Sequence, residues 1–172
     1  MIQVVFQGLG GQGAKSAAEI LAEAAFFEGK EIQAFPEFGP ERRGTPIKAY
    51  VRISDKKITT HEPITRPDYT IIIDSGLAVK ERMAGICIIN SAQTAESIRK
   101  QTGYKGEMHI LDASSIINFA NLPMLAAFVK VSGAVKLESV LKQTEELFGP
   151  KMGAEKLKQT LEAMKKAYEM VK

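Results

Sequence analysis

The chain has 172 residues, of which 45% are hydrophobic and 25% are charged, with a formal net charge of +3. This length suits one domain with a sizeable apolar core. The net charge is far smaller than that of a protein with the concentrated basic face that binds duplex nucleic acid. Composition therefore predicts a single domain over residues 1–172 that does not bind nucleic acid.

The first sixty residues predict strands around one helix. Alternation and apolar runs indicate strands, and apolar residues three and four apart indicate a helix. The expected strands are Ile2–Phe6, Glu31–Phe35 and Ile47–Ile53, with Ile58–Thr60 as a short hairpin partner, and the expected helix is Ala14–Glu28, ended by Gly29.

The middle of the chain alternates strand and helix, and the last third is helical only. The strands are Tyr69–Ile73, Ile86–Ile89 and Met108–Leu111, and the helices between them are Leu77–Met83 and Thr94–Thr102. The later helices are Ser114–Phe119, Met124–Val131, Leu137–Phe148, ending before Gly149-Pro150, and Ala154–Val171. Such alternation favours an α/β fold with a mostly parallel sheet.

A glycine loop joins the first strand to the first helix. It comprises Gly8, Leu9, Gly10, Gly11, Gln12 and Gly13, which is GxGxxG spacing in the strand–loop–helix context that gives the pattern meaning. Backbone N–H groups at a helix start favour an anion such as a nucleotide phosphate. The alternative is that the glycines only permit a tight turn and close helix packing, and the sequence leaves both open.

A second motif, the segment Phe35–Pro46, connects two strands and combines three prolines with charged and aromatic residues. Its prolines restrict the backbone, and its arginines offer planar forks that suit carboxylates or phosphates. We expect Phe38, Glu41, Arg42 and Arg43 to contact a partner chain. The alternative is that an arginine pairs with a glutamate of the same segment.

No arrangement of catalytic side chains is indicated, and we assign no catalytic residue. His61 and His109 stand alone, without the spacing of a metal site. The single Cys87 lies in an apolar run and is expected in the core, and one thiol cannot hold an iron–sulfur cluster. Asp74–Gly76 follows a central strand, where it either lines a ligand site or caps a helix.

The N-terminus runs from Met1 directly into an apolar strand, without the basic stretch and apolar segment of a signal peptide. No uncharged segment approaches the length that spans a bilayer. We therefore expect a cytoplasmic protein that does not interact with membranes.

Together the two motifs resemble the gamma subunits of the 2-oxoacid:ferredoxin oxidoreductase family, in particular those of pyruvate:ferredoxin oxidoreductase (pyruvate synthase). The similarity covers essentially the full chain, although Leu9, Lys15 and Leu157 depart from the usual family residues. The matching residues are Gly10–Gly13, Ala17, Leu21-Ala22, Ala24-Ala25, Gly29-Lys30, Phe35–Pro46, Val51–Asp55, Pro67-Asp68, Asn121, Met124-Leu125 and Ala167–Glu169.

The resemblance implies a complex that oxidatively decarboxylates a 2-oxoacid, forms an acyl-coenzyme A and reduces ferredoxin. It implies that thiamine diphosphate and iron–sulfur clusters lie on alpha, beta and delta-type subunits, and that this chain holds no cofactor and is inactive alone. It further implies a three-layer α/β/α domain that serves assembly and borders the coenzyme A site. The glycine loop, Gly8 with Gly10–Gly13, would then contact a coenzyme A phosphate.

Three other interpretations remain open. A free-standing dinucleotide-binding redox domain would explain the glycine spacing alone, and it predicts that the isolated chain binds a nicotinamide or flavin cofactor. A pure scaffold would make no ligand contact. A gamma subunit for 2-oxoglutarate, branched-chain oxoacids or indolepyruvate would share these motifs, although the sequence of Pro36–Pro46 favours pyruvate.

Overall fold

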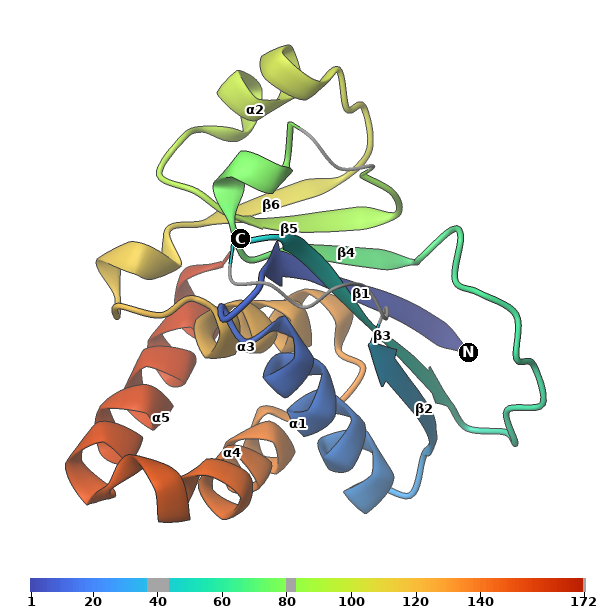
Figure 1. Cartoon of the computed structure of the whole chain (residues 1–172), viewed down its shortest axis with the longest axis vertical. Helices are drawn as coiled ribbons and strands as arrows, with labels where there is room; N and C mark the ends of the chain where they lie inside the picture. The colour runs from blue at the N-terminus through green and yellow to red at the C-terminus, as the bar shows by residue number, and fades with distance from the viewer. Residues whose placement is uncertain (37–43, 80–82, 172) are drawn as a thin grey trace.

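A computed structural model describes residues 1–36, 44–79 and 83–171, which form one six-stranded sheet with helices packed on it (Figure 1). The strands are β1 (Ile2–Leu9), β2 (Glu31–Pro36), β3 (Pro46–Ser54), β4 (Tyr69–Ile72), β5 (Ile86–Asn90) and β6 (Met108–Leu111). The α-helices are α1 (Ala14–Phe27), α2 (Ala95–Thr102), α3 (Asn121–Ser132), α4 (Leu137–Met152) and α5 (Ala154–Met170), and two 3₁₀ turns are η1 (Ser75–Leu77) and η2 (Ala113–Ser115).

The strand order is β2-β3-β1-β4-β5-β6. β1, β4, β5 and β6 pair in parallel, whereas β3 pairs antiparallel with both β1 and β2. The mostly parallel α/β sheet that the alternating pattern predicts is therefore confirmed. The antiparallel pairing of β3 was not expected from that pattern.

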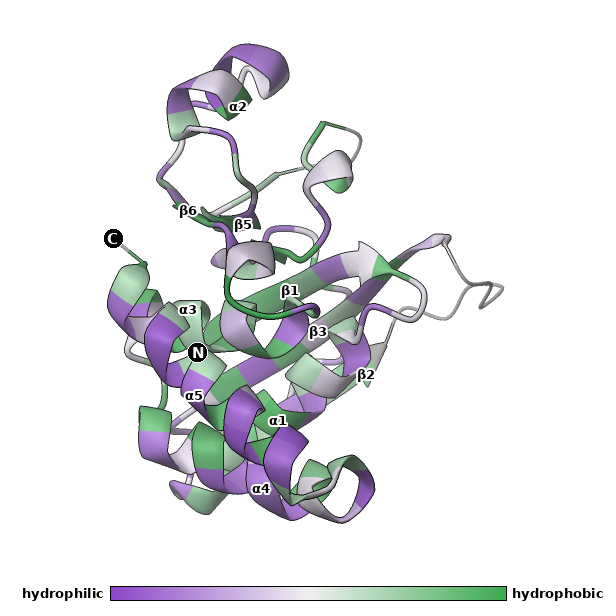
Figure 2. Ribbon diagram, turned by 90° about the vertical axis from the view of Figure 1, so that its left-hand side faces the viewer, coloured by the Kyte–Doolittle hydropathy of each residue, from purple (hydrophilic) through white to green (hydrophobic). Residues whose placement is uncertain are grey.

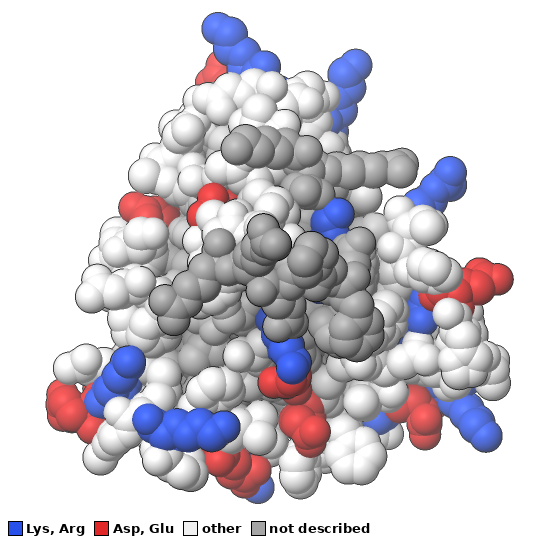
Figure 3. All heavy atoms as spheres, in the orientation of Figure 1, with Lys and Arg blue, Asp and Glu red and all other residues white. Residues whose placement is uncertain are grey.

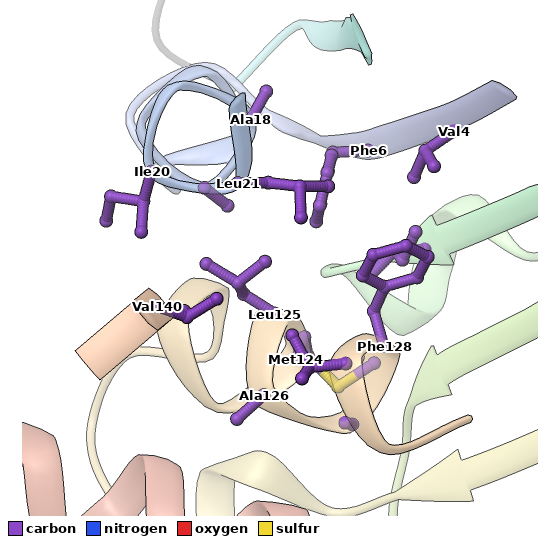
Figure 4. Close-up of a cluster of buried hydrophobic side chains, with 14 of the residues drawn as sticks. Val4, Phe6, Ala18, Ile20, Leu21, Met124, Leu125, Ala126, Phe128 and Val140 are labelled. Carbon is purple, nitrogen blue, oxygen red and sulfur yellow. The ribbon is translucent and has the colours of Figure 1, made fainter. Parts of the chain in front are cut away.

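The main core lies between one face of the sheet and the helices α1 and α3 (Figures 1 and 4). Phe6 of β1 and Leu21 of α1 point toward Leu125 and Phe128 of α3, and all four are fully buried. The rings of Phe6 and Phe128 meet edge to face with centroids 6.3 Å apart. Each such side chain contributes about 1.5–3 kcal/mol when it is fully buried, so this cluster fixes how α1 leaves the end of β1.

α4 and α5 form an outer layer on the same side, with hydrophobic and hydrophilic residues alternating along both helices (Figure 2). The predicted end of α4 before Gly149-Pro150 is wrong, because the helix continues to Met152. Pro150 removes only one backbone donor near the end of the helix. The helix ends instead at Gly153, whose φ of 77° starts the turn into α5. Across the described ranges, no helix has both the length and the apolar character that crossing a membrane requires.

α2 and η1 cover the opposite face of the sheet over β4, β5 and β6. Ile98 of α2 packs there with Ile72, Cys87 and Ile89. Helical elements thus lie on both faces, which confirms the predicted three-layer arrangement. Thr94 caps α2 by accepting a hydrogen bond from the backbone N–H of Ser97, so the predicted start of this helix is also confirmed.

Segment 55–68 follows β3 and is not a strand, so the predicted hairpin partner at Ile58–Thr60 is wrong. Hydrogen bonds from side chains, and not a ladder of backbone hydrogen bonds, hold this segment. Gln33 Nε2 donates to the carbonyl oxygen of Thr60 at 3.3 Å, and the guanidinium of Arg52 donates to that of Glu62. The segment is therefore anchored to the sheet by two polar side chains.

In the described parts of two predicted helices, the structure has a single 3₁₀ turn. Asp74 caps η1 where Leu77–Met83 was expected to be helical, although residues 80–82 lie outside the described ranges. Asp112 caps η2 where Ser114–Phe119 was expected. In both turns an aspartate accepts a hydrogen bond from a backbone N–H two or three residues ahead, which competes with a continuing helix.

Cys87 is fully buried, as the sequence predicts, and burial raises the pKa of its thiol above the usual value. Because the thiolate is the reactive form, we expect iodoacetamide at neutral pH to alkylate the folded chain at least about a hundredfold more slowly than the denatured chain. Mass spectrometry of timed samples measures both rates. Equal rates would contradict the buried placement.

Candidate functional site

The carboxyl ends of β1, β4 and β5 open on a cavity of about 440 Å³. The connection after β1 leads toward β2 on one side, and the connection after β4 leads toward β5 on the other. Open parallel sheets bind ligands where connections diverge in this way. The lining residues are Gly11, Gln12, Gly13, Ile73, Asp74, Ser75, Asn90, Ser114, Asn118, Phe119, Ala120 and Asn121; we call this cavity the glycine pocket.

The glycine loop forms one wall of the pocket and leads directly into α1. Gly11 and Gly13 have φ values of 94° and 81°, a region that residues with a Cβ rarely adopt. Gly13 is also packed closely, because a Cβ at this position would lie 2.9 Å from the Cγ of Asn121. The loop therefore needs glycine at position 13 for both conformation and space.

The loop uses most of its own backbone donors. Leu9 N–H donates to Gln12 Oε1 at 2.8 Å, and Gln12 N–H donates to the carbonyl oxygen of Leu9 at 2.9 Å. Gly10 N–H donates to the carbonyl oxygen of Thr45 at 2.8 Å. α1 has no side-chain cap at Gly13, so its first-turn N–H groups have no intrahelical partner.

Asp74 joins the two strand ends. Its Oδ2 accepts a hydrogen bond from Gln12 Nε2 at 2.7 Å, and its Oδ1 accepts one from the backbone N–H of Gly76 at 3.0 Å. Asp74 therefore caps η1, which confirms one of its two interpretations. It also lines the glycine pocket, where a ligand stays a prediction.

Three asparagines complete the pocket, and sequence reasoning did not assign any of them to a site. The buried Asn90 donates to the carbonyl oxygen of Ile73 at 2.9 Å and accepts from Ala113 N–H at 3.0 Å. Asn121 donates to the carbonyl oxygen of Gly13 at 3.3 Å, and Asn118 is exposed at the rim. The sequence offered one signal for these residues, which is a position at or soon after the carboxyl end of a predicted parallel strand. Only Asn90 has such a position.

The structure brings together the glycine loop and the end of the Phe35–Pro46 segment. Gly10 bonds to Thr45 in one direction, and Gly44 N–H donates to the carbonyl oxygen of Gly10 at 3.3 Å in the other. Gly8 is buried beneath the loop, where a Cβ would lie 3.4 Å from Gln12 Oε1. The predicted interface residues Phe38, Glu41, Arg42 and Arg43 lie outside the described residues, so their role stays a prediction.

The remaining polar candidates lie elsewhere. His109 pairs with Glu107 at 2.9 Å on the edge strand β6, and His61 is exposed on segment 55–68. Among the described residues on the face shown in Figure 3, lysines and arginines are interspersed with acidic residues and do not gather in one patch. Within the ranges that the structure covers, no three histidine, cysteine or acidic side chains cluster as metal ligands would.

Comparison with known proteins assigns the chain to a family. Residues 3–170 match the family model described as pyruvate ferredoxin/flavodoxin oxidoreductase. Pyruvate synthase subunit PorC of Thermotoga maritima is 39% identical, with 99% of this chain and 94% of the relative covered. The common gamma subunit of the pyruvate/ketoisovalerate oxidoreductases of Thermococcus litoralis is also 39% identical, with 96% and 97% covered.

Solved structures agree. The crystal structure of the Thermotoga maritima subunit superposes with a TM-score of 0.85 at 36% identity, over 99% of this chain and 97% of that one. A 2-oxoglutarate:ferredoxin oxidoreductase from Magnetococcus marinus shares the fold, with a TM-score of 0.78 at 19% identity over 98% of this chain and 30% of that one. The chain therefore belongs to the pyruvate ferredoxin/flavodoxin oxidoreductase family, as the resemblance of its two motifs predicted.

Proposed function

We propose that this chain, as one gamma-type domain over residues 1–172, is the gamma subunit of a cytoplasmic complex that oxidatively decarboxylates pyruvate to acetyl-coenzyme A and passes electrons to ferredoxin. The observation that carries the proposal is the full-length similarity to a pyruvate synthase subunit. The Thermococcus litoralis relative is named for both pyruvate and ketoisovalerate, so a second 2-oxoacid is the favoured alternative substrate.

The proposal places the reactive cofactors on partner subunits. Thiamine diphosphate would supply the carbanion chemistry of decarboxylation, and iron–sulfur clusters would carry the electrons. A [4Fe–4S] cluster takes about four cysteine ligands, and this chain has one cysteine, which is buried. Its own residues therefore serve assembly and ligand positioning, with alpha, beta and delta-type chains as partners.

The segment Phe35–Pro46 is proposed to dock this subunit on a partner. Both of its ends are held in the structure. Phe35 stacks on Tyr50 with ring centroids 5.4 Å apart, and the other end is hydrogen-bonded to Gly10. A segment fixed at both ends loses less conformational freedom on binding, which suits the contact that we assign to Phe38, Glu41, Arg42 and Arg43.

Docking is tested by co-purification of the native complex. The double variant Arg42→Ala/Arg43→Ala is expected to lose most of the co-eluting subunits, because charge-assisted contacts to a partner disappear. The matched control is Arg66→Ala, since Arg66 is an exposed arginine on segment 55–68. Circular dichroism should show that all variants are folded. Recovery of the full complex by the double variant would contradict the docking role.

The glycine pocket is proposed to border the site of coenzyme A. The Magnetococcus marinus enzyme of the same fold was solved with coenzyme A bound. The pocket lies at the ligand position expected for an open parallel sheet, and its volume of about 440 Å³ is within the range of small-molecule sites. A free-standing dinucleotide-binding domain would instead require saturable binding of a nicotinamide or flavin cofactor by the isolated chain, which calorimetry can test.

A further inference from the structure

We infer that the glycine pocket takes an uncharged, amide- or hydroxyl-bearing part of its ligand and not a phosphate. This inference rests on the proposed coenzyme A contact and narrows it. Coenzyme A has two chemically distinct halves: a 3′-phosphorylated adenosine diphosphate, which is anionic, and a pantetheine arm, which carries amides and a hydroxyl. The pocket distinguishes between them through the groups that it presents.

The first argument is charge. Asp74 is the one ionised side chain among the residues that line the pocket, and its carboxylate is an acceptor only. The described lining includes no lysine, arginine or histidine to offset it. A phosphate placed in the pocket would therefore meet a like charge, which opposes the attraction of the α1 N-terminus.

The second argument is hydrogen-bonding capacity. Asp74 accepts from Gln12 and Gly76, which leaves part of its roughly four acceptor positions for a ligand. Asn121 uses its Nδ2 on Gly13, so its Oδ1 also remains an acceptor. Two free acceptors favour N–H or O–H groups on the ligand. An amide or a hydroxyl supplies them, and an ionised phosphate does not.

The third argument is the state of the glycine loop. In a phosphate-binding loop the backbone N–H groups point at the anion. Here three N–H groups of the loop are taken within the protein: Leu9 N–H by the side chain of Gln12, Gly10 N–H by the carbonyl oxygen of Thr45, and Gln12 N–H by that of Leu9. The side-chain amide of Gln12 thus bridges the loop and Asp74, because its Nε2 donates to Asp74 Oδ2 at 2.7 Å. Asn118 and Ser75 at the rim add neutral donors and acceptors.

The test uses the assembled oxidoreductase with Asn118→Ala, because Asn118 is exposed and its loss leaves the internal hydrogen bonds of the pocket intact. Two quantities are measured: the KM for coenzyme A, and the inhibition constant of its nucleotide half, 3′-phosphorylated adenosine diphosphate. Thr59→Ala, an exposed change on segment 55–68, is the control for a surface substitution. Gel filtration verifies that each complex is assembled.

We expect Asn118→Ala to raise the KM for coenzyme A about two- to tenfold, the loss of one neutral hydrogen bond, with the inhibition constant of the nucleotide half unchanged. A parallel rise in both quantities would overturn the inference and leave the coenzyme A contact standing. No change in either would overturn both the inference and the contact.

Asn118→Lys gives an independent check at the same position. If phosphates enter the pocket, a lysine should strengthen binding of the nucleotide half, since it would add a cation beside them. We expect no tightening, together with a higher KM for coenzyme A. A lower inhibition constant for the nucleotide half in this variant would contradict the inference.

Discussion

Arg52→Ala is expected to destabilise the chain by about 3 kcal/mol, because it leaves several acceptors without their donor. Only 2% of Arg52 is exposed. Its guanidinium donates to Gln33 Oε1 at 2.6 Å, to the carbonyl oxygen of Glu62, and more weakly to Gln3 Oε1 at 3.4 Å. It also lies 5.5 Å from the ring centroid of Phe35.

The expected shift in Tm is about 6–12 °C for a chain of this size, measured by differential scanning calorimetry. Arg52→Lys keeps the charge and loses the planar fork, so it should recover less than half of the loss. The control Arg66→Ala should stay within about 0.5 kcal/mol of the parent chain. An Arg52→Ala chain as stable as its parent would show that segment 55–68 needs no anchor on the sheet.

The central strands and the long helices follow from local pattern, and this is why they could be predicted. Burial is directly visible in the sequence as apolar runs such as Ile86–Ile89 and as the apolar stripe along α5. Errors in the predicted elements occur where side-chain hydrogen bonds determine the backbone conformation. Arg52 and Gln33 hold segment 55–68 without a ladder, and Asp112 closes a turn in place of a helix. None of these contacts leaves a periodic signal in the sequence.

The candidate site was only partly visible in the sequence. The glycine loop and Asp74 follow predicted strands, so their positions at the sheet edge could be anticipated. The bond between Gln12 and Asp74 joins residues 62 positions apart, and Asn121 reaches Gly13 across 108 positions. Neither pairing can be derived from one sequence, because strand order and helix packing determine them.

Gly13→Ala is expected to cost about 2–4 kcal/mol of stability and at least tenfold in coenzyme A affinity, because the substitution disturbs both backbone and pocket. The positive φ of 81° accounts for about 1–2 kcal/mol. The remainder comes from Asn121, whose side chain would contact the new Cβ and must leave the carbonyl oxygen of Gly13.

Gly11→Ala is the matched control, since Gly11 has a similar φ of 94° and nothing within 4 Å of an added Cβ. It should show the backbone cost alone, about 1–2 kcal/mol. A double-mutant cycle isolates the contact: in an Asn121→Ala background, Gly13→Ala should cost no more than Gly11→Ala does in the parent chain. Denaturant unfolding of the chain and calorimetry of coenzyme A binding to the complex measure the two effects. A cost of Gly13→Ala that is unchanged by removal of the Asn121 side chain would refute the packing of α3 against the glycine loop as its cause.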